Sequence, residues 1–148
     1  LSHIPGVFIR LKGSTREIEN QYDMEERELV AIQNIVFSER EVSTSLIKWS
    51  DVVVNFASSI GLEAVMQNKT IINPKYLHSN TTIFDNSTVA IDCNSSNCVQ
   101  EQICNIKENL VEVTTRQDRQ EFYKKFIQGN NSDSDVLGKY VKLVIGND

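Results

Sequence analysis

A run of three valines constrains this chain most. Residues 51–56 read Asp-Val-Val-Val-Asn-Phe, so β-branched apolar side chains follow one another without the alternation of a half-exposed strand. Such a run is typical of a parallel strand that is buried on both faces of a sheet. Parallel neighbours need crossover connections, which are usually helices. The run therefore predicts an α/β fold, a parallel sheet with helices on both of its faces.

The rest of the chain fits this scheme, because short apolar runs alternate with helical patterns along the first 95 residues. Most of these runs are followed by polar or turn-forming residues, as strands are. We expect strands near residues 7–11, 34–37, 52–56, 70–73 and 88–92.

Helical patterns lie between these strands and fill the C-terminal region. An apolar stripe with steps of four and three residues predicts an amphipathic helix within residues 99–113 that lies on the sheet. Ser43 and Thr44 are expected to cap a short helix whose Trp49 packs in the core. Further helices are expected around residues 24–32, 59–68, 122–127 and 136–144.

Length and charge limit the domain count and the partners. A chain of 148 residues with 40% hydrophobic residues favours one domain, residues 1–148, with its own core. The net charge of −5 has the wrong sign for a nucleic-acid binder, although a local basic site could hold one or two phosphates. No apolar run approaches the ~20 residues of a membrane span, so no transmembrane segment is expected.

The cysteines indicate a cytoplasmic protein. Cys93, Cys98 and Cys104 are odd in number and spaced by five and six residues, which fits neither a paired disulfide framework nor CxxC zinc ligands. We interpret them as reduced, unpaired thiols. Cys98 and Cys104 lie six apart on the predicted helix and are not expected to meet. No other set of residues has metal-ligand spacing, so no metal site is expected.

The turn that follows the valine run, residues 56–63, is the candidate binding site. Ligands of parallel sheets bind at the carboxyl ends of the strands. Ser58, Ser59 and Gly61 are small enough for an anion to approach the start of the next helix. Glu63 can accept hydrogen bonds from the hydroxyls of a ribose. The same residues also fit an ordinary helix N-terminus with no ligand.

Residues 50–72 carry a resemblance to a known family. The S-S-I-G-L-E-A string at residues 58–64, with a strand before and after it, resembles the donor-binding segment of two-domain (GT-B) glycosyltransferases of capsule and surface-polysaccharide synthesis. Asn68 and Thr70 stand where that family usually has Gly and Pro. The resemblance implies a Rossmann-like half that binds a nucleotide sugar as substrate, with no cofactor, and a glycan acceptor held through a second domain.

The resemblance also assigns roles to individual residues. Ser58, Ser59 and the backbone amides near Ile60 and Gly61 would hold the diphosphate, and Glu63 would hold the ribose. The matched pattern contains no catalytic residue, so the catalytic group stays unassigned.

Two basic residues at the end of the first predicted strand are further candidates. Related enzymes often carry basic residues there that face the donor phosphates, and Arg10 and Lys12 occupy this place. Alternatively, both side chains project from the solvent-facing side of an edge strand, because they are two residues apart.

The chain is expected to be one piece of a longer protein, since it begins at Leu1 without Met and lacks a counterpart of the family's other domain. Alone, it is expected to be inactive. Two alternatives stay open: half of a sugar-nucleotide 2-epimerase, and a non-catalytic Rossmann-like binding or scaffold module. Binding of a nucleoside diphosphate would separate the enzyme halves from the scaffold.

Overall fold

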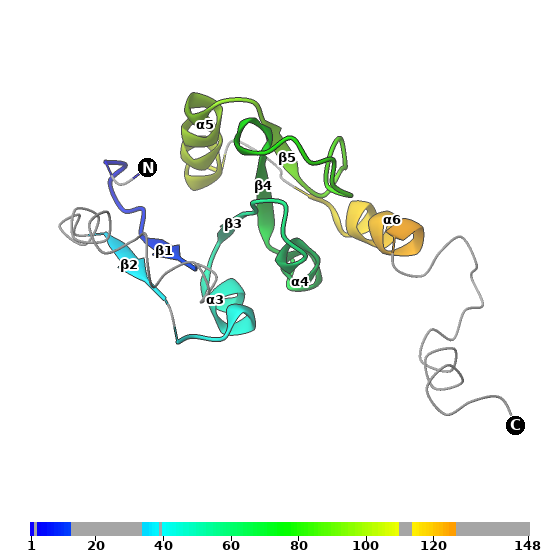
Figure 1. Cartoon of the computed structure of the whole chain (residues 1–148), viewed down its shortest axis with the longest axis horizontal. Helices are drawn as coiled ribbons and strands as arrows, with labels where there is room; N and C mark the ends of the chain where they lie inside the picture. The colour runs from blue at the N-terminus through cyan, green and yellow to red at the C-terminus, as the bar shows by residue number, and fades with distance from the viewer. Residues whose placement is uncertain (2, 13–33, 39, 110–113, 127–148) are drawn as a thin grey trace, which may run out of the picture.

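The computed structural model describes residues 1, 3–12, 34–38, 40–109 and 114–126, and this part of the chain has an α/β fold (Figure 1). The helices predicted around residues 24–32 and 136–144 lie outside these ranges, as does the end of the 99–113 stripe. None of the helices in the described ranges is long and apolar enough to cross a membrane.

The larger sheet carries the valine run as an outer strand, so the expectation of a strand buried on both faces is wrong: Val52, Val53 and Val54 are only half-buried. This sheet has three strands in the order β3 (Val52–Val54), β4 (Thr70–Pro74) and β5 (Ile91–Cys93). Both pairings are parallel, which confirms the predicted strand direction. The central strand is β4, with Ile71, Ile72 and Asn73 all fully buried.

A second, smaller sheet pairs β1 (Ile9–Leu11) with β2 (Ile35–Phe37), also in parallel. The sequence predicted one continuous sheet, and this is wrong for the described strands, which form two. The reason is limited burial: Arg10, in the middle of β1, is exposed, and Val36, in the middle of β2, is 49% exposed. Strands that bury so little apolar surface gain little from a place inside the larger sheet.

Helices cover both faces of the larger sheet, as predicted. One face packs Ile71 against α3 (Ser43–Trp49), α4 (Ile60–Met66) and α6 (Arg116–Phe126). Successive strand residues point to opposite faces, so Ile72 faces the other way. There it meets Cys93 and Val99 beneath α5, and α5 and α4 lie on opposite sides of β4 in Figure 1.

The helix α5 runs over Ser96–Lys107, so it begins before the predicted stripe and ends earlier than predicted, at the C-cap Glu108 and the left-handed Asn109. Its N-cap is Ser95, whose side chain accepts a hydrogen bond from the backbone of Cys98. The helix α6 is longer than the predicted 122–127 segment because it begins at Arg116.

Three strand boundaries differ from the prediction. The strand β1 begins at Ile9 rather than near residue 7. The strand β3 ends at Val54; the backbone amide of Asn55 still donates to the carbonyl of Ile72 at 2.9 Å, and the chain leaves the sheet at Phe56. The strand β5 begins at Ile91 rather than near residue 88, because turns occupy most of the preceding segment. Val89 is nevertheless buried, which explains why its segment resembled a strand.

Two expectations about α3 are wrong. Its N-cap is Val42, without a side-chain cap, and Ser43 and Thr44 lie inside the helix. Thr44 makes its hydrogen bond across to α4 instead. Trp49 is 52% exposed, with the guanidinium of Arg10 5.0 Å from its ring centroid. This contact ties the smaller sheet to α3.

Candidate functional site

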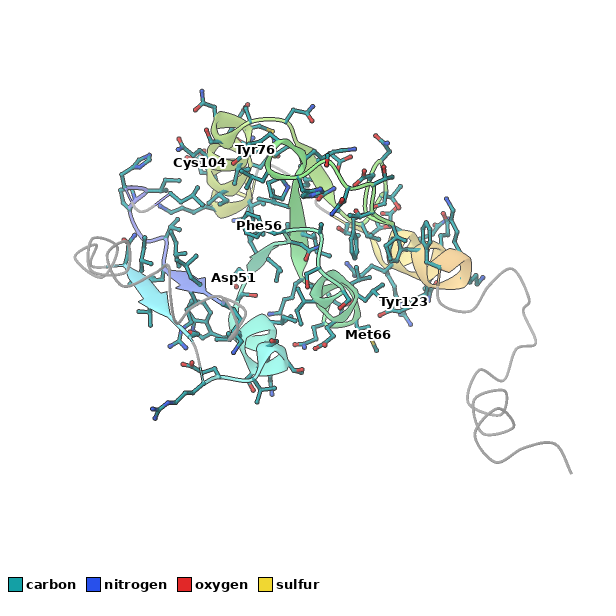
Figure 2. All side chains as sticks on the ribbon, in the orientation of Figure 1. Asp51, Phe56, Met66, Tyr76, Cys104 and Tyr123 are labelled. Carbon is teal, nitrogen blue, oxygen red and sulfur yellow. The ribbon has the colours of Figure 1, made fainter. Side chains whose placement is uncertain are left out.

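The strands of the larger sheet are parallel, so they end at one edge, which we call the carboxyl edge. Asn55 follows β3 there, and the short 3-10 helix η1 (Lys75–Leu77) follows β4. Phe56 and Tyr76, labelled in Figure 2, are 59% and 43% exposed at this edge. The sequence analysis did not single out these aromatic residues, because exposure of an aromatic ring has no signature in the sequence.

The turn from β3 into α4 has an unusual backbone. Ala57 has φ of 52°, a left-handed conformation that residues other than glycine seldom adopt. The helix begins at Ile60, within one residue of the prediction, and its N-cap Ser59 makes no side-chain cap bond. The hydroxyl of Ser58 accepts a hydrogen bond of 3.3 Å from the amide of Ile60. Both serines are exposed, so their hydroxyls can be reached from solvent.

Gly61 is fixed by packing. A Cβ atom at this position would lie 2.6 Å from Phe84 Cζ and 2.9 Å from Asn55 Nδ2. Phe84 is 2% exposed and has no room to move away. A glycine is therefore required for α4 to approach the sheet, and this packing role stands beside the predicted role of the nearby amides.

Asn55 is the residue at this edge that the sequence analysis missed. Its side chain is 1% exposed, and neither amide atom has a hydrogen-bond partner in the described part of the chain. A buried polar group without a partner destabilises a fold by about 1–3 kcal/mol, so such groups call for an explanation. The signal in the sequence was a polar residue directly after a run of three valines.

Glu63 is held by a neighbouring helix. The hydroxyl of Thr44, on α3, donates a hydrogen bond of 2.7 Å to Glu63 Oε2. The carboxylate is half-buried in the first turn of α4. Its orientation is therefore set from outside its own helix.

Arg10 and Lys12 lie at the smaller sheet and contact the segment after β2. Arg10 forms an ion pair with Glu41, with 2.9 Å between Nη1 and Oε1, and Lys12 Nζ donates to the carbonyl of Glu41 at 2.8 Å. Their predicted contact with donor phosphates stays a prediction.

A second buried asparagine, Asn73 in β4, is tied to two carboxylates. Its Nδ2 donates to Asp85 Oδ1 at 3.1 Å and to Asp92 Oδ1 at 2.8 Å. The other oxygen of Asp92 accepts a bond of 2.8 Å from the amide of Asn86. These bonds fasten the turn before β5 onto the sheet.

Asp85 is an ionised anchor of this network. Lys75 Nζ lies 3.0 Å from its Oδ2, and the Thr82 hydroxyl donates to its Oδ1 at 2.9 Å. The hydrogen bond from Lys75, helped by those from Thr82 and Asn73, lowers the pKa of Asp85 from 3.8 to about 2 against the opposing effect of burial. A carboxyl group of such low pKa stays ionised near neutral pH, so Asp85 is a poor proton donor there.

Within the described ranges, no group of three or more His, Cys, Asp or Glu side chains could hold a metal ion. The chain matches no family model, no curated protein and no solved structure. Its function is therefore inferred from the chemistry of the carboxyl edge.

Proposed function

We propose that this chain binds the nucleoside diphosphate part of a nucleotide sugar at the carboxyl edge of its larger sheet. It would serve as the Rossmann-like donor half of a GT-B glycosyltransferase that transfers the sugar to a surface polysaccharide or another glycan. The observation that carries the proposal is Asn55, a buried amide without a partner among the described residues, at the turn that resembles the donor site of this family.

The polar groups of this turn suit an anionic ligand. Ser58 and Ser59 present exposed hydroxyls in the turn that follows Asn55, and the side chain of Ser59 does not cap the helix behind it. Hydroxyl and amide N–H groups donate to phosphate oxygens, and such charge-assisted hydrogen bonds are about twice as strong as neutral ones. Binding of a diphosphate would thus give these groups partners.

The remaining parts of a nucleotide also find suitable groups. Glu63 can accept hydrogen bonds from ribose hydroxyls while Thr44 keeps its carboxylate in place. The exposed rings of Phe56 and Tyr76 follow neighbouring strands and offer apolar faces to a base or a sugar ring.

Calorimetric titration of the chain with UDP, GDP and CDP tests this proposal. At least one of them should bind, and Glu63→Gln should weaken that binding about tenfold or more, because a charge-assisted hydrogen bond contributes ~1.5–3 kcal/mol. Ser59→Val should act in the same direction by removing a donor and crowding the phosphate. The exposed Met66 on the same helix supplies the matched control, Met66→Ala, which should bind normally.

The circular dichroism of each variant must match that of the unchanged chain for the comparison to count. Absence of binding by all three nucleotides contradicts the proposal. Equal binding by the Glu63→Gln, Ser59→Val and Met66→Ala variants would place any nucleotide site elsewhere.

A further inference from the structure

Two cysteine sulfur atoms lie close together where β5 meets α5. Cys93 is the last residue of β5 and is fully buried against Ile72 and Val99. Cys98 lies in the first turn of α5 and is half-buried. Their Sγ atoms are 2.8 Å apart, and both residues are free thiols. The spacing of five residues had not indicated this contact.

The local fold holds both thiols in position. Strand pairing fixes Cys93, because β5 pairs with the central strand up to Pro74 and Cys93. The helix cap fixes Cys98, because the Ser95 side chain accepts a hydrogen bond of 3.2 Å from its backbone amide. The chain thus reverses between the two cysteines through an ordered cap, and little movement separates the thiols from the ~2.05 Å of a covalent S–S bond.

We propose that Cys93 and Cys98 form a reversible intramolecular disulfide when the chain meets a low-molecular-weight disulfide such as oxidised glutathione. This thiol–disulfide site joins the carboxyl end of β5 to the start of α5. Neither cysteine is a residue of the proposed nucleotide site.

The exchange proceeds in two steps that balance. The more accessible Cys98 loses its proton, and its sulfur attacks one sulfur of the small disulfide, which breaks that S–S bond and releases one small thiol. Cys93 then loses its proton, and its sulfur attacks the Cys98 sulfur of the mixed disulfide, which releases the second small thiol. The two protein thiols lose two electrons and two protons, and the small disulfide gains them.

The different surroundings of the two thiols set this order. Burial, followed by the hydrogen bond with Cys98, raises the pKa of Cys93 to about 12. While both thiols are free, Cys93 therefore keeps its proton and is shielded from an oxidant in solution. Once Cys98 carries the mixed disulfide, it brings the reactive sulfur to Cys93, and the buried thiol needs no access to solvent.

Cys104 is the matched control within the same helix. It is a free, half-buried thiol on α5, as Cys98 is, but it lies six residues further along. Two enzymes separate it from the pair in a digest, since trypsin cleaves after Lys75 and Lys107 and Glu-C cleaves after Glu101. The pair is then contained in peptide 76–101, and Cys104 in peptide 102–107.

The experiment incubates the folded chain with oxidised glutathione, alkylates the remaining thiols in denaturant and analyses the double digest by mass spectrometry. In the unchanged chain, peptide 76–101 should be two hydrogens lighter and unalkylated, while peptide 102–107 should be alkylated. Cys104→Ser should leave the link intact, and Cys98→Ser should abolish it. Dithiothreitol should restore two alkylated cysteines to peptide 76–101.

Three outcomes would overturn the inference. In the first, all three cysteines of the folded, unchanged chain are alkylated. In the second, the disulfide joins the two peptides and so involves Cys104. In the third, a stable glutathione adduct remains on Cys98 and no internal bond replaces it. Circular dichroism of the Cys98→Ser variant verifies that loss of the link does not come from unfolding.

Discussion

Two buried asparagines stand on neighbouring strands of the larger sheet with opposite hydrogen bonding. Val54 of β3 pairs with Ile72 of β4, and Asn55 and Asn73 are the residues that follow them. Asn73 donates to two carboxylates through Nδ2 and lacks a partner only at Oδ1, whereas neither amide atom of Asn55 has a partner among the described residues. Both side chains are at most 1% exposed.

The difference separates structure from function at one edge of a sheet. The Asn73 side chain, together with Asp85 and Asp92, stabilises the turn before β5. The Asn55 side chain destabilises the fold unless it binds something. A buried polar group that does not serve stability is the place where a ligand contact is expected.

The largest expected effect follows from replacing the partnered asparagine. Asn73→Leu removes the donor of two hydrogen bonds to carboxylates, Asp85 and Asp92, so the free energy of unfolding should fall by about 3 kcal/mol or more. Urea denaturation measures this. If Asn73→Leu is as stable as Asn55→Leu, the comparison between the two asparagines fails.

Substitution of Gly61 tests the close packing of α4 against Phe84 and Asn55. Gly61→Ala places a methyl group against the buried ring of Phe84 and should destabilise the chain by about 1–3 kcal/mol. The control Met66→Ala, on the exposed side of the same helix, should change stability by less than about 0.5 kcal/mol. Equal stability of the two variants in urea would show that α4 does not approach the sheet this closely.

The dependence of stability on pH sharpens the assignment of Asp85. Its pKa is lowered from 3.8 to about 2 in the folded chain, so folding favours the ionised carboxylate. This contribution is present above about pH 4 and is lost as the pH falls towards about 2. Asp85→Asn should therefore lower stability at pH 7 and lose less stability than the unchanged chain between pH 4 and pH 2. If urea denaturation gives the same pH dependence for Asp85→Asn and the unchanged chain, Asp85 is not held ionised by Lys75, Thr82 and Asn73.

The sequence predicted much of this arrangement, for identifiable reasons. Val52–Val54 form a strand because β-branched residues favour one, although they lie half-buried in an outer strand of the larger sheet, and the α5 stripe follows from its period. The left-handed Asn68, φ 57°, shows why asparagine can replace the glycine of the resembling family. Contacts between distant residues were not predictable: Thr44 with Glu63, and Asn73 with its carboxylates, depend on how the elements pack.

Asn55→Leu is expected to change the free energy of unfolding least. It is also expected to weaken nucleotide binding. Leucine has a similar volume and no polar atoms, so the free energy of unfolding should stay the same or rise by about 1 kcal/mol. At the same time, the side chain loses every hydrogen bond it could offer a diphosphate.

Calorimetric titration of Asn55→Leu with the nucleoside diphosphate that the unchanged chain binds most tightly is the most direct test of the account. We expect affinity at least tenfold weaker in a variant that is no less stable in urea. Unchanged affinity in the folded variant would contradict the claim that the ligand binds at Asn55 on the carboxyl edge.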